Sequence, residues 1–229
     1  TFSGGRAFDR AAVHGAIDAY IASTARISLL DIVGAPAWVP RPGRLRSGPA
    51  MRSMKAMADT AITERRMAGH AGVPDLLDLL LDGEDPETRR RMTTAELRDN
   101  LLTFIVAGHE TTALTLAWAL YLVAFDQGVQ ERARAEARGV LGTRAAAVAD
   151  LPALPHVRRI VDETLRLYPP AAFLSRTARA RDTLCGREVR PGDTLMLPIY
   201  ALHRNHLLWP DPHRFDPDRF ADAKAIDRF

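Results

Sequence analysis

A long run from Thr94 to about Phe125 contains no proline, and it constrains the fold more than any other part of the chain. At about 1.5 Å per residue, a helix over this range would span roughly 45 Å, enough to cross a whole domain. Thr93 and Glu96 have the spacing of a capping box and predict the start of the helix. Apolar residues recur every three to four positions and then nearly surround the helix, at Leu97, Leu101, Phe104, Ile105, Leu114, Leu116, Trp118, Leu120, Leu122 and Val123. The pattern predicts a central, buried helix.

The middle of this run reads Ala107-Gly108-His109-Glu110-Thr111-Thr112, which packing alone does not explain. A carboxylate is costly to desolvate, and a threonine competes with the hydrogen bonds of the helix backbone. Ala107 and Gly108 remove side-chain bulk one turn before Thr111, so a flat ligand could approach the backbone. Because Thr111 can bond the carbonyl of the preceding turn and open the helix locally, we expect a polar notch in an apolar wall.

A second set of residues lies in the next long helical pattern, from His156 to Tyr168, which a Pro-Pro pair ends. Glu163 and Arg166 are three residues apart on one side of this helix. On a surface helix such a pair would contribute only a few tenths of a kcal/mol. Downstream, the segment 215–220 holds Arg219 between aromatic residues, where it could share the Glu163 carboxylate.

Taken together, these segments resemble the cytochromes P-450, the haem-thiolate monooxygenases. Residues 107–112 are similar to the oxygen-binding motif on the family's long central helix. Glu163-Thr164-Leu165-Arg166 is similar to its Glu-x-x-Arg motif, and residues 215–220 to the later segment whose arginine completes a Glu-Arg-Arg lock. The resemblance implies a mainly α fold with a long central helix and a small β region, of which the chain would form about half.

The resemblance also implies roles for residues of the central helix. Ala107 and Gly108 would pack over the distal face of a haem b cofactor. Thr111 would hold dioxygen and a neighbouring water by hydrogen bonds, and Glu110 would belong to the proton-delivery route, because an acid beside a hydroxyl gives protons an ordered path. The alternative for Thr111 is a structural threonine that bonds only the helix backbone.

Other matched residues would have binding or structural roles. Glu163, Arg166 and Arg219 would be structural, because a buried carboxylate shared by two forked guanidiniums fixes the scaffold behind the haem-ligand loop. Arg176 stands where the family usually has a cation paired with a haem propionate; the alternative is a free surface arginine. Phe173 and Leu174, with Phe104 and Ala107 opposite, would line a pocket for an apolar organic substrate.

The implied activity is that of a haem-dependent monooxygenase, which inserts one atom of dioxygen into a small apolar organic molecule. Its electrons would come from a ferredoxin, a flavodoxin or a fused reductase. Two alternatives remain: a catalytically inactive fragment or scaffold without haem, and a peroxide-driven hydroxylase of the same fold. The pair Glu110-Thr111 favours a user of dioxygen.

The sequence departs from the family pattern at the haem ligand. The family's axial cysteine lies in a Phe-x-x-Gly-x-Arg-x-Cys-x-Gly loop that follows the segment matching Phe220, and no such loop occurs before Phe229. The only cysteine, Cys185, lacks this motif, and we expect it in a hairpin strand with a type II turn at residues 190–193. An earlier Trp-x-x-x-Arg motif also has no counterpart. We therefore expect residues 1–229 to form one incomplete domain without a metal ligand, inactive by itself.

Two metal sites are disfavoured. His109-Glu110 begins like the helix of a zinc protease, but Ala113 stands where the second histidine would be required. His203 and His206 have no nearby cysteine or carboxylate set, so we expect solvated loop residues.

Composition is that of a globular chain, with 229 residues, 47% apolar content and a single cysteine. We expect a cytoplasmic protein without a membrane anchor, because Asn100, His109 and Glu110 interrupt the most apolar run. The net charge of +3 does not call for nucleic acid. Arginine far outnumbers lysine, which suggests a bacterial source. Arginines at 132–138 form a solvated face or a docking surface for an acidic electron donor.

The remaining pattern predicts mostly helices with breaks at proline and glycine. In the methionine-containing segment, Met51, Met54 and Met57 share one face, and we expect them to pack in the core; the alternative is a cofactor site. The expected elements are a helix over 8–24, a loop over 36–49, helices over 50–68, 75–81 and 129–141, a charged connection over 83–93 and strands within 174–197.

Overall fold

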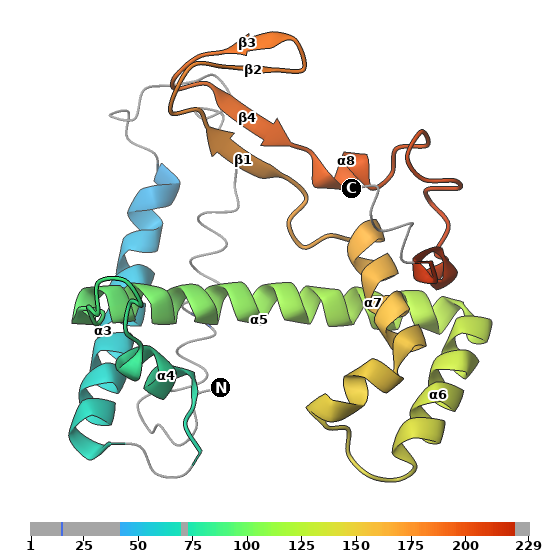
Figure 1. Ribbon diagram of the computed structural model, residues 1–229, viewed down its shortest axis with the longest axis horizontal. Helices are drawn as coiled ribbons and strands as arrows, with labels where there is room; N and C mark the ends of the chain where they lie inside the picture. The colour runs from blue at the N-terminus through green and yellow to red at the C-terminus, as the bar shows by residue number, and fades with distance from the viewer. Residues whose placement is uncertain (1–14, 16–41, 70–72, 223–229) are drawn as a thin grey trace. The chain divides into compact units, whose positions relative to one another are not determined.

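The computed structural model describes residues 15, 42–69 and 73–222 (Figure 1). The described part is mainly helical, and the chain divides into two compact units, residues 1–108 and 109–229. The helices are α3 (Pro42–Ala68), α4 (Leu76–Asp82), α5 (Thr94–Phe125), α6 (Gln127–Leu141), α7 (Pro155–Leu167) and α8 (Ile199–Leu202), with 3-10 helices η1 (Val148–Ala153) and η2 (Pro217–Phe220). The strands are β1 (Leu174–Thr177), β2 (Asp182–Leu184), β3 (Arg187–Val189) and β4 (Thr194–Leu197).

The core of the first unit forms where α3 and α4 pack against the beginning of α5. Its buried members are Met54, Ala58 and Ile62 of α3, Leu77 of α4, and Leu97, Leu101 and Leu102 of α5. The partly buried Met51 and Met57 pack against the same cluster, so the prediction that the methionine stripe belongs to the core is confirmed. Methionine suits this place because its flexible side chain fills irregular gaps between helices.

Charged groups fix the junction between α3 and α4. The Asp75 side chain accepts hydrogen bonds from the backbone N–H groups of Leu77 and Asp78, and the Asp78 side chain accepts one from Asp75 N, which completes a capping box. Arg65 of α3 bonds both carboxylates, at 3.1 Å to Asp75 and 2.6 Å to Asp78. These hydrogen bonds raise the pKa of Arg65. The start of α4 is thereby tied to the end of α3.

The start of α5 agrees with the predicted capping box. Thr93 N donates to Glu96 Oε2 at 2.8 Å, and Glu96 N donates to Thr93 Oγ1 at 3.3 Å. Arg90 also donates to both carboxylate oxygens of Glu96, at 2.9 and 2.8 Å. These bonds, with Arg90 as the main cause, hold the pKa of Glu96 at about 2. The charged connection before α5 is therefore ordered by ion pairs, which include Arg91–Glu84 at 3.1 Å.

The prediction that all of α5 is buried is wrong for its second half. The buried residues of the helix are Leu97, Leu101 and Leu102, all in its first three turns. An all-round apolar helix needs neighbours on every side, and the described elements cover only part of this one. Large apolar side chains remain exposed along it, at Phe104, Leu114, Leu116, Leu120, Tyr121 and Phe125.

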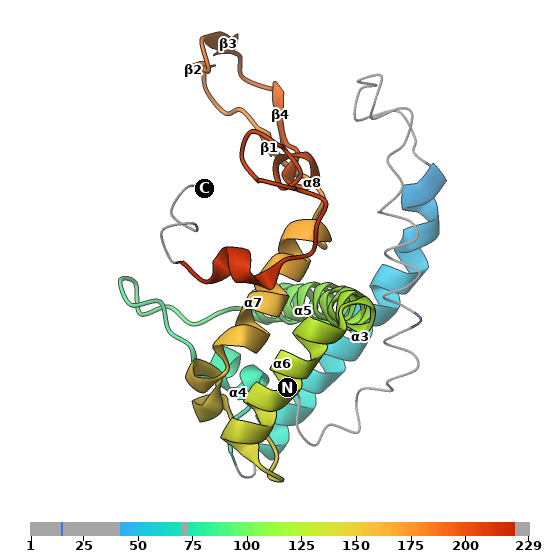
Figure 2. The same ribbon diagram turned by 90° about the vertical axis from the view of Figure 1, so that its right-hand side faces the viewer.

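In the second unit α6, η1 and α7 pack together (Figure 2). α6 follows its N-cap Asp126 and is ended by its C-cap Gly142, in agreement with the predicted polar helix. The N-cap position of α7, Leu154, has no side-chain hydrogen bond of its own. Glu136 of α6 supplies one instead, because its carboxylate accepts from His156 N at 2.8 Å and from Val157 N at 2.9 Å. A carboxylate at a helix start also interacts favourably with the helix dipole.

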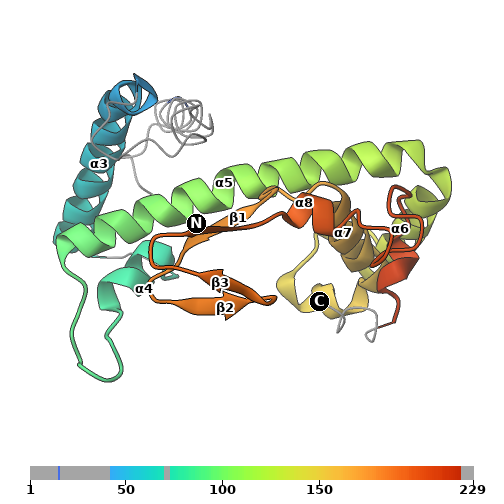
Figure 3. The ribbon, with the colours of Figure 1, turned by 90° about the horizontal axis from the view of Figure 1, so that it is seen from above.

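The β region consists of two antiparallel pairs, β1 with β4 and β2 with β3 (Figure 3). The predicted turn at residues 190–193 is present, with Asp193 N bonded to Arg190 O at 3.0 Å and Gly192 at φ 94°. The prediction that Cys185 lies in a strand is wrong: it is exposed in the two-residue turn between β2 and β3. Cys185 and Gly186 both have positive φ, at 50° and 75°, as such tight hairpins require.

Two further predictions concern the N-terminal part. The expected loop over residues 36–49 is wrong from residue 42, because α3 begins at Pro42 and contains Pro49. Proline is compatible with the first turn of a helix, where its missing N–H is not needed, whereas Pro49 removes one backbone hydrogen bond. The helix expected over residues 8–24 lies outside the described residues, apart from position 15. Among the described residues, no single helix is long and apolar enough to cross a membrane; one bent pair, α5 with α6, passes on length and composition.

The core of the first unit gives a direct test of this packing. Leu101→Ala should lower the free energy of unfolding by about 2 to 5 kcal/mol, because it removes a fully buried side chain and leaves a cavity. Leu79→Ala, on the exposed side of α4, is the matched control and should change it by less than about 0.5 kcal/mol. Urea unfolding of the 229-residue chain measures both, and equal losses would contradict the assigned core.

Candidate functional site

The residues 107–112 lie near the middle of α5, on a helix that is α-helical throughout. Ala107, Gly108 and Thr111 are exposed, and Glu110 is half-buried. A Cβ atom added at Gly108 would meet no atom within 4 Å beyond its chain neighbours and the adjacent helix backbone, so the helix surface is open at this point. These residues therefore form a partly polar strip with small side chains on the surface of α5. A flat ligand could pack against this strip.

The expected local opening of the helix is not seen, since no break interrupts α5. The hydroxyl of Thr115 bonds the Thr111 carbonyl at 2.8 Å, which leaves the regular helix intact. Because Glu110 is only half-buried and Thr111 is exposed, their presence carries no large desolvation cost in this structure. The strip is polar without being strained.

The structure brings Glu163, Arg166 and Arg219 together, and we refer to them as the Glu-Arg-Arg cluster. Arg166 Nε donates to Glu163 Oε2 at 2.7 Å and Arg166 Nη2 to Glu163 Oε1 at 2.8 Å, a forked pair. The side chains of Arg166 and Glu163 are 1% and 0% exposed. Arg219 Nε lies 3.4 Å from Glu163 Oε1, and the backbone N–H of Asp216 donates to the same oxygen at 2.9 Å.

Arg166 uses every N–H of its guanidinium. Beyond the two bonds to Glu163, Nη1 donates to the carbonyls of His203 and Pro212, both at 2.7 Å, and Nη2 donates to Arg214 O at 3.1 Å. These five bonds match the five donors that the group carries. The guanidinium also lies 5.1 Å from the centre of the Trp209 ring. A lysine could not reproduce this arrangement, because its ammonium group has three donors.

Arg219 is held differently. Its Nη2 donates to Asp211 O at 2.7 Å, and its Nη1 donates to Pro210 O. Its Nε is close enough to Glu163 for an ion pair, but it is buried and lacks hydrogen-bond geometry to any described atom. Arg219 is therefore the less firmly bonded arginine of the cluster.

The remaining predicted residues are not joined into one site by the structure. Arg176 is exposed on β1, and its Nη1 donates to the neighbouring Ser175 carbonyl at 2.8 Å. Phe173 and Leu174 precede it and are exposed, as is Phe104 on α5. The proposed pocket and the propionate contact stay predictions.

The sequence did not predict several contacts of α6. Arg132, assigned to a solvated or docking face, donates to Asp218 at 2.7 Å, and Glu136 caps α7. Arg134 pairs with Glu131 on the exposed side of α6. The alternating charges of α6 predicted ion pairs within the helix, but they did not indicate which residues of other segments would pair with it.

An aromatic stack also went unpredicted. The rings of Trp118 and Tyr168 are parallel, with centres 4.0 Å apart. The guanidinium of Arg204 lies 5.4 Å from the Tyr168 ring and 3.8 Å from the Tyr200 ring. The stack ties the end of α7 to α8 and to the second half of α5.

The histidines that were considered as metal ligands do not form such a site. His203 was expected in solvent but is partly buried, where its ring Nδ1 lies 3.2 Å from the Arg166 carbonyl. Burial is the main cause that lowers the pKa of His203. His206 is exposed. Within residues 42–69 and 73–222, no group of three or more His, Cys, Asp or Glu side chains is placed to hold a metal ion.

Comparison with known proteins identifies the class to which this fold belongs. A family model described as Cytochrome P-450 matches residues 11–229. Because the match covers nearly the whole chain, the chain belongs to the cytochrome P-450 family. The prediction of a mainly α, partial cytochrome P-450 fold is confirmed.

Among curated relatives, cyclooctat-9-en-7-ol 5-monooxygenase of Streptomyces melanosporofaciens is 40% identical over 192 residues, 83% of this chain and 42% of that protein. Cyclooctatin synthase of the same species is 34% identical over 196 residues, 86% of this chain and 43% of that protein. The chain thus spans less than half the length of either relative.

Solved structures agree. The haem domain of cytochrome P-450DA has a TM-score of 0.77 and 31% identity, and the match covers 94% of this chain and 46% of that one. A retinoic-acid-bound cyanobacterial protein, CYP120A1, has a TM-score of 0.81 at 23% identity, with 96% and 48% covered. The second likeness shows the fold alone.

The Glu-Arg-Arg cluster leads to a prediction on stability. Glu163→Ala should lower the free energy of unfolding by about 3 to 5 kcal/mol, because it leaves the buried Arg166 guanidinium without its counter-charge. Glu131→Ala removes the exposed ion pair with Arg134 and should lower the free energy of unfolding by less than about 1 kcal/mol. Parallel expression of the complete protein should give little soluble, haem-containing Glu163→Ala and near-normal yields of Glu131→Ala. Similar haem contents would show that the cluster does not hold the scaffold.

Proposed function

We propose that the complete protein is a haem-dependent monooxygenase that inserts one atom of dioxygen into a small apolar organic substrate. The observation that carries this proposal is membership of the cytochrome P-450 family together with the half-buried Glu110 and exposed Thr111 beside Ala107 and Gly108. The name of the relative from Streptomyces melanosporofaciens, a monooxygenase, supports the reaction class.

The residues of α5 suit one face of a flat cofactor. Exposed Ala107 and Gly108 carry little bulk, and the space beside Gly108 is open to a group that approaches the helix. Cys185, the only cysteine among the 229 residues, is exposed in the turn between β2 and β3. Ala107 and Gly108 would therefore lie against one face of a haem b group, and the cysteine thiolate that would bind its iron would belong to the complete protein and not to these 229 residues. When bound, the haem supplies the activation of dioxygen and the electron transfer.

The roles of the polar residues follow from proton transfer. Thr111 would hold a water molecule by its hydroxyl and keep it within reach of dioxygen. The half-buried Glu110 carboxylate, one residue earlier, is partly open to solvent, and it would pass protons toward this water. An acid and a hydroxyl in sequence give protons one ordered route.

Substrate and redox partner belong to the same proposal. An apolar pocket would be lined by Phe104, Ala107, Phe173 and Leu174. Of these, Phe104, Phe173 and Leu174 expose large apolar side chains. The electron donor would be a ferredoxin, a flavodoxin or a fused reductase. The exposed arginines of α6, such as Arg134, would attract an acidic donor. Relatives from Streptomyces support a bacterial source, and we propose a cytoplasmic location.

The reduced, carbon-monoxide difference spectrum of the complete protein tests this function. A Soret band shifted far to the red is expected, because it requires haem with an axial thiolate. The 229 residues alone should give no such band, which would fit an inactive fragment. A complete protein without the band would support a scaffold without haem, and product formation with peroxide but without reductant would support the peroxide-driven alternative.

The role of Thr111 gives a further prediction for the complete protein. Thr111→Ala should keep oxidising reductant but yield less product and more hydrogen peroxide, because stray water would replace the positioned proton donor. Because a positioned acid or base typically contributes about 10²- to 10⁴-fold to a rate, we expect the product formed per reductant to fall by about tenfold or more. Thr115→Ala, whose hydroxyl bonds the helix backbone, is the control. Unchanged product per reductant would contradict the role.

The assignment of Arg176 to a haem propionate is also testable. A charge-assisted bond from a guanidinium to a carboxylate contributes about 1.5 to 3 kcal/mol, so Arg176→Leu should lose haem faster on dilution or gel filtration. Arg179→Leu and Arg181→Leu, in the exposed stretch that follows β1, should retain haem like the parent. If all three variants retain haem equally, Arg176 is an ordinary surface residue.

A further inference from the structure

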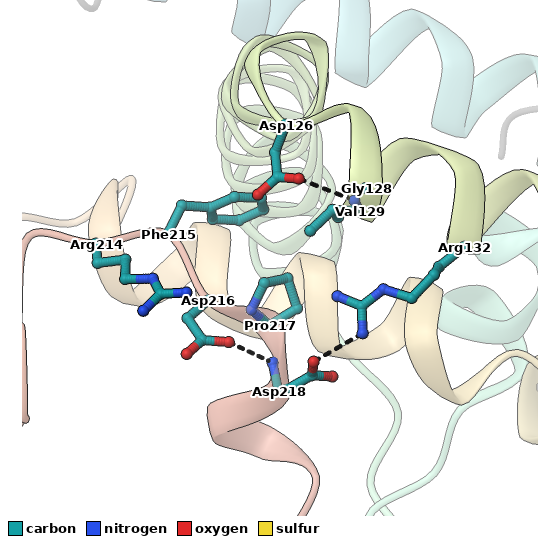
Figure 4. A pocket seen from close by; sticks show the side chains of 9 residues that line it. All are labelled: Asp126, Gly128, Val129, Arg132, Arg214, Phe215, Asp216, Pro217 and Asp218. Carbon is teal, nitrogen blue, oxygen red and sulfur yellow. Dashed lines mark hydrogen bonds and ion pairs between the residues drawn. The ribbon is translucent and has the colours of Figure 1, made fainter.

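Asp218 carries a carboxylate that joins η2 to two helices of the second unit. Its Oδ2 accepts a hydrogen bond from Arg132 Nη1 of α6 at 2.7 Å, and its Oδ1 accepts one from Arg159 Nη1 of α7 at 3.0 Å. Figure 4 shows Arg132 directed at Asp218 beside a groove of about 430 Å³ between the start of α6 and η2. We name these three residues the Asp218 bridge. The hydrogen bond from Arg132 is the main cause that lowers the pKa of Asp218.

The element that carries Asp218 has little stability of its own. η2 is a 3-10 helix of four residues, and a helix this short depends on its contacts for a fixed position. Pro217 is buried, and Asp216 both caps η2 through its side chain and donates its N–H to Glu163. These contacts hold the beginning of η2, while the Asp218 bridge holds the next residue.

The residue after Asp218 is Arg219 of the Glu-Arg-Arg cluster. Its Nε is 3.4 Å from Glu163 Oε1 without a good hydrogen bond, whereas Arg166 is fixed by five bonds. A small displacement of η2 would therefore weaken the Arg219–Glu163 contact and leave the Arg166–Glu163 pair unchanged. Arg219 depends on the position of η2 in a way that Arg166 does not.

We propose that Asp218 is a positioning residue, which fixes η2 between α6 and α7 and so holds Arg219 at the Glu163 carboxylate. The competing view is that Asp218 forms ordinary surface ion pairs, which contribute little, since its side chain is 46% exposed. The proposal concerns the scaffold and is independent of the reaction proposed above, because its test measures unfolding.

A double-mutant cycle in the complete protein separates the two views. Asp218→Asn should raise the rate of urea-induced unfolding about fivefold in the parent, and less than about twofold when Arg219 is already Gln. The matched control is Asp162→Asn, which removes an ion pair of α7 with Arg158 that does not involve η2. It should change the rate by less than about twofold in both backgrounds. If Arg219→Gln does not give soluble protein, Arg219→Lys serves as the second background.

Two outcomes would overturn the proposal. If Asp218→Asn raises the unfolding rate equally in both backgrounds, Asp218 does not act through Arg219. If the unfolding rate changes in neither background, Asp218 forms only ordinary surface ion pairs. Asp218→Glu adds an independent measurement, because it keeps the carboxylate and should unfold within about twofold of the parent rate. If Asp218→Glu unfolds as fast as Asp218→Asn, the carboxylate is not the group that positions η2.

Discussion

The second unit depends on one buried negative charge, the Glu163 carboxylate. A buried carboxylate is tolerated only with full compensation, and here the donors come from Arg166 of the same helix and from the segment around η2. The same guanidinium supplies partners to carbonyls at His203, Pro212 and Arg214, which lie outside regular helices and strands. Buried carbonyls need hydrogen-bond donors. The Arg166 side chain therefore holds this segment in place, although the segment has little regular structure of its own.

Around this centre, acidic side chains at the surface orient helix α7. Glu136 occupies its first N–H groups from α6, and Asp218 reaches Arg159 in its middle from η2. Each contact joins segments distant in sequence and involves a charge that is at most half-buried. The helix that carries Glu163 and Arg166 is therefore placed by contacts at its start, its middle and its buried face.

Local signals explain what the sequence could predict. The capping box at Thr93 and Glu96, the turn at residues 190–193 and the three-residue spacing of Glu163 and Arg166 each involve neighbours in the chain. By contrast, Arg132 and Asp218 are 86 residues apart, and such a pairing leaves no local trace. Apolar periodicity predicted the existence of α5 but not its exposure, because periodicity does not say which neighbours will cover a helix.

The turn that holds Cys185 has a practical consequence. The chain has one cysteine, and its side chain is exposed at the tip of the β2–β3 hairpin. A thiol-reactive fluorophore or spin label attached there would occupy a single defined position among these 229 residues. Because Cys185 lies outside the paired residues of β2 and β3, the label would report on movement of the hairpin with little disturbance of its strands.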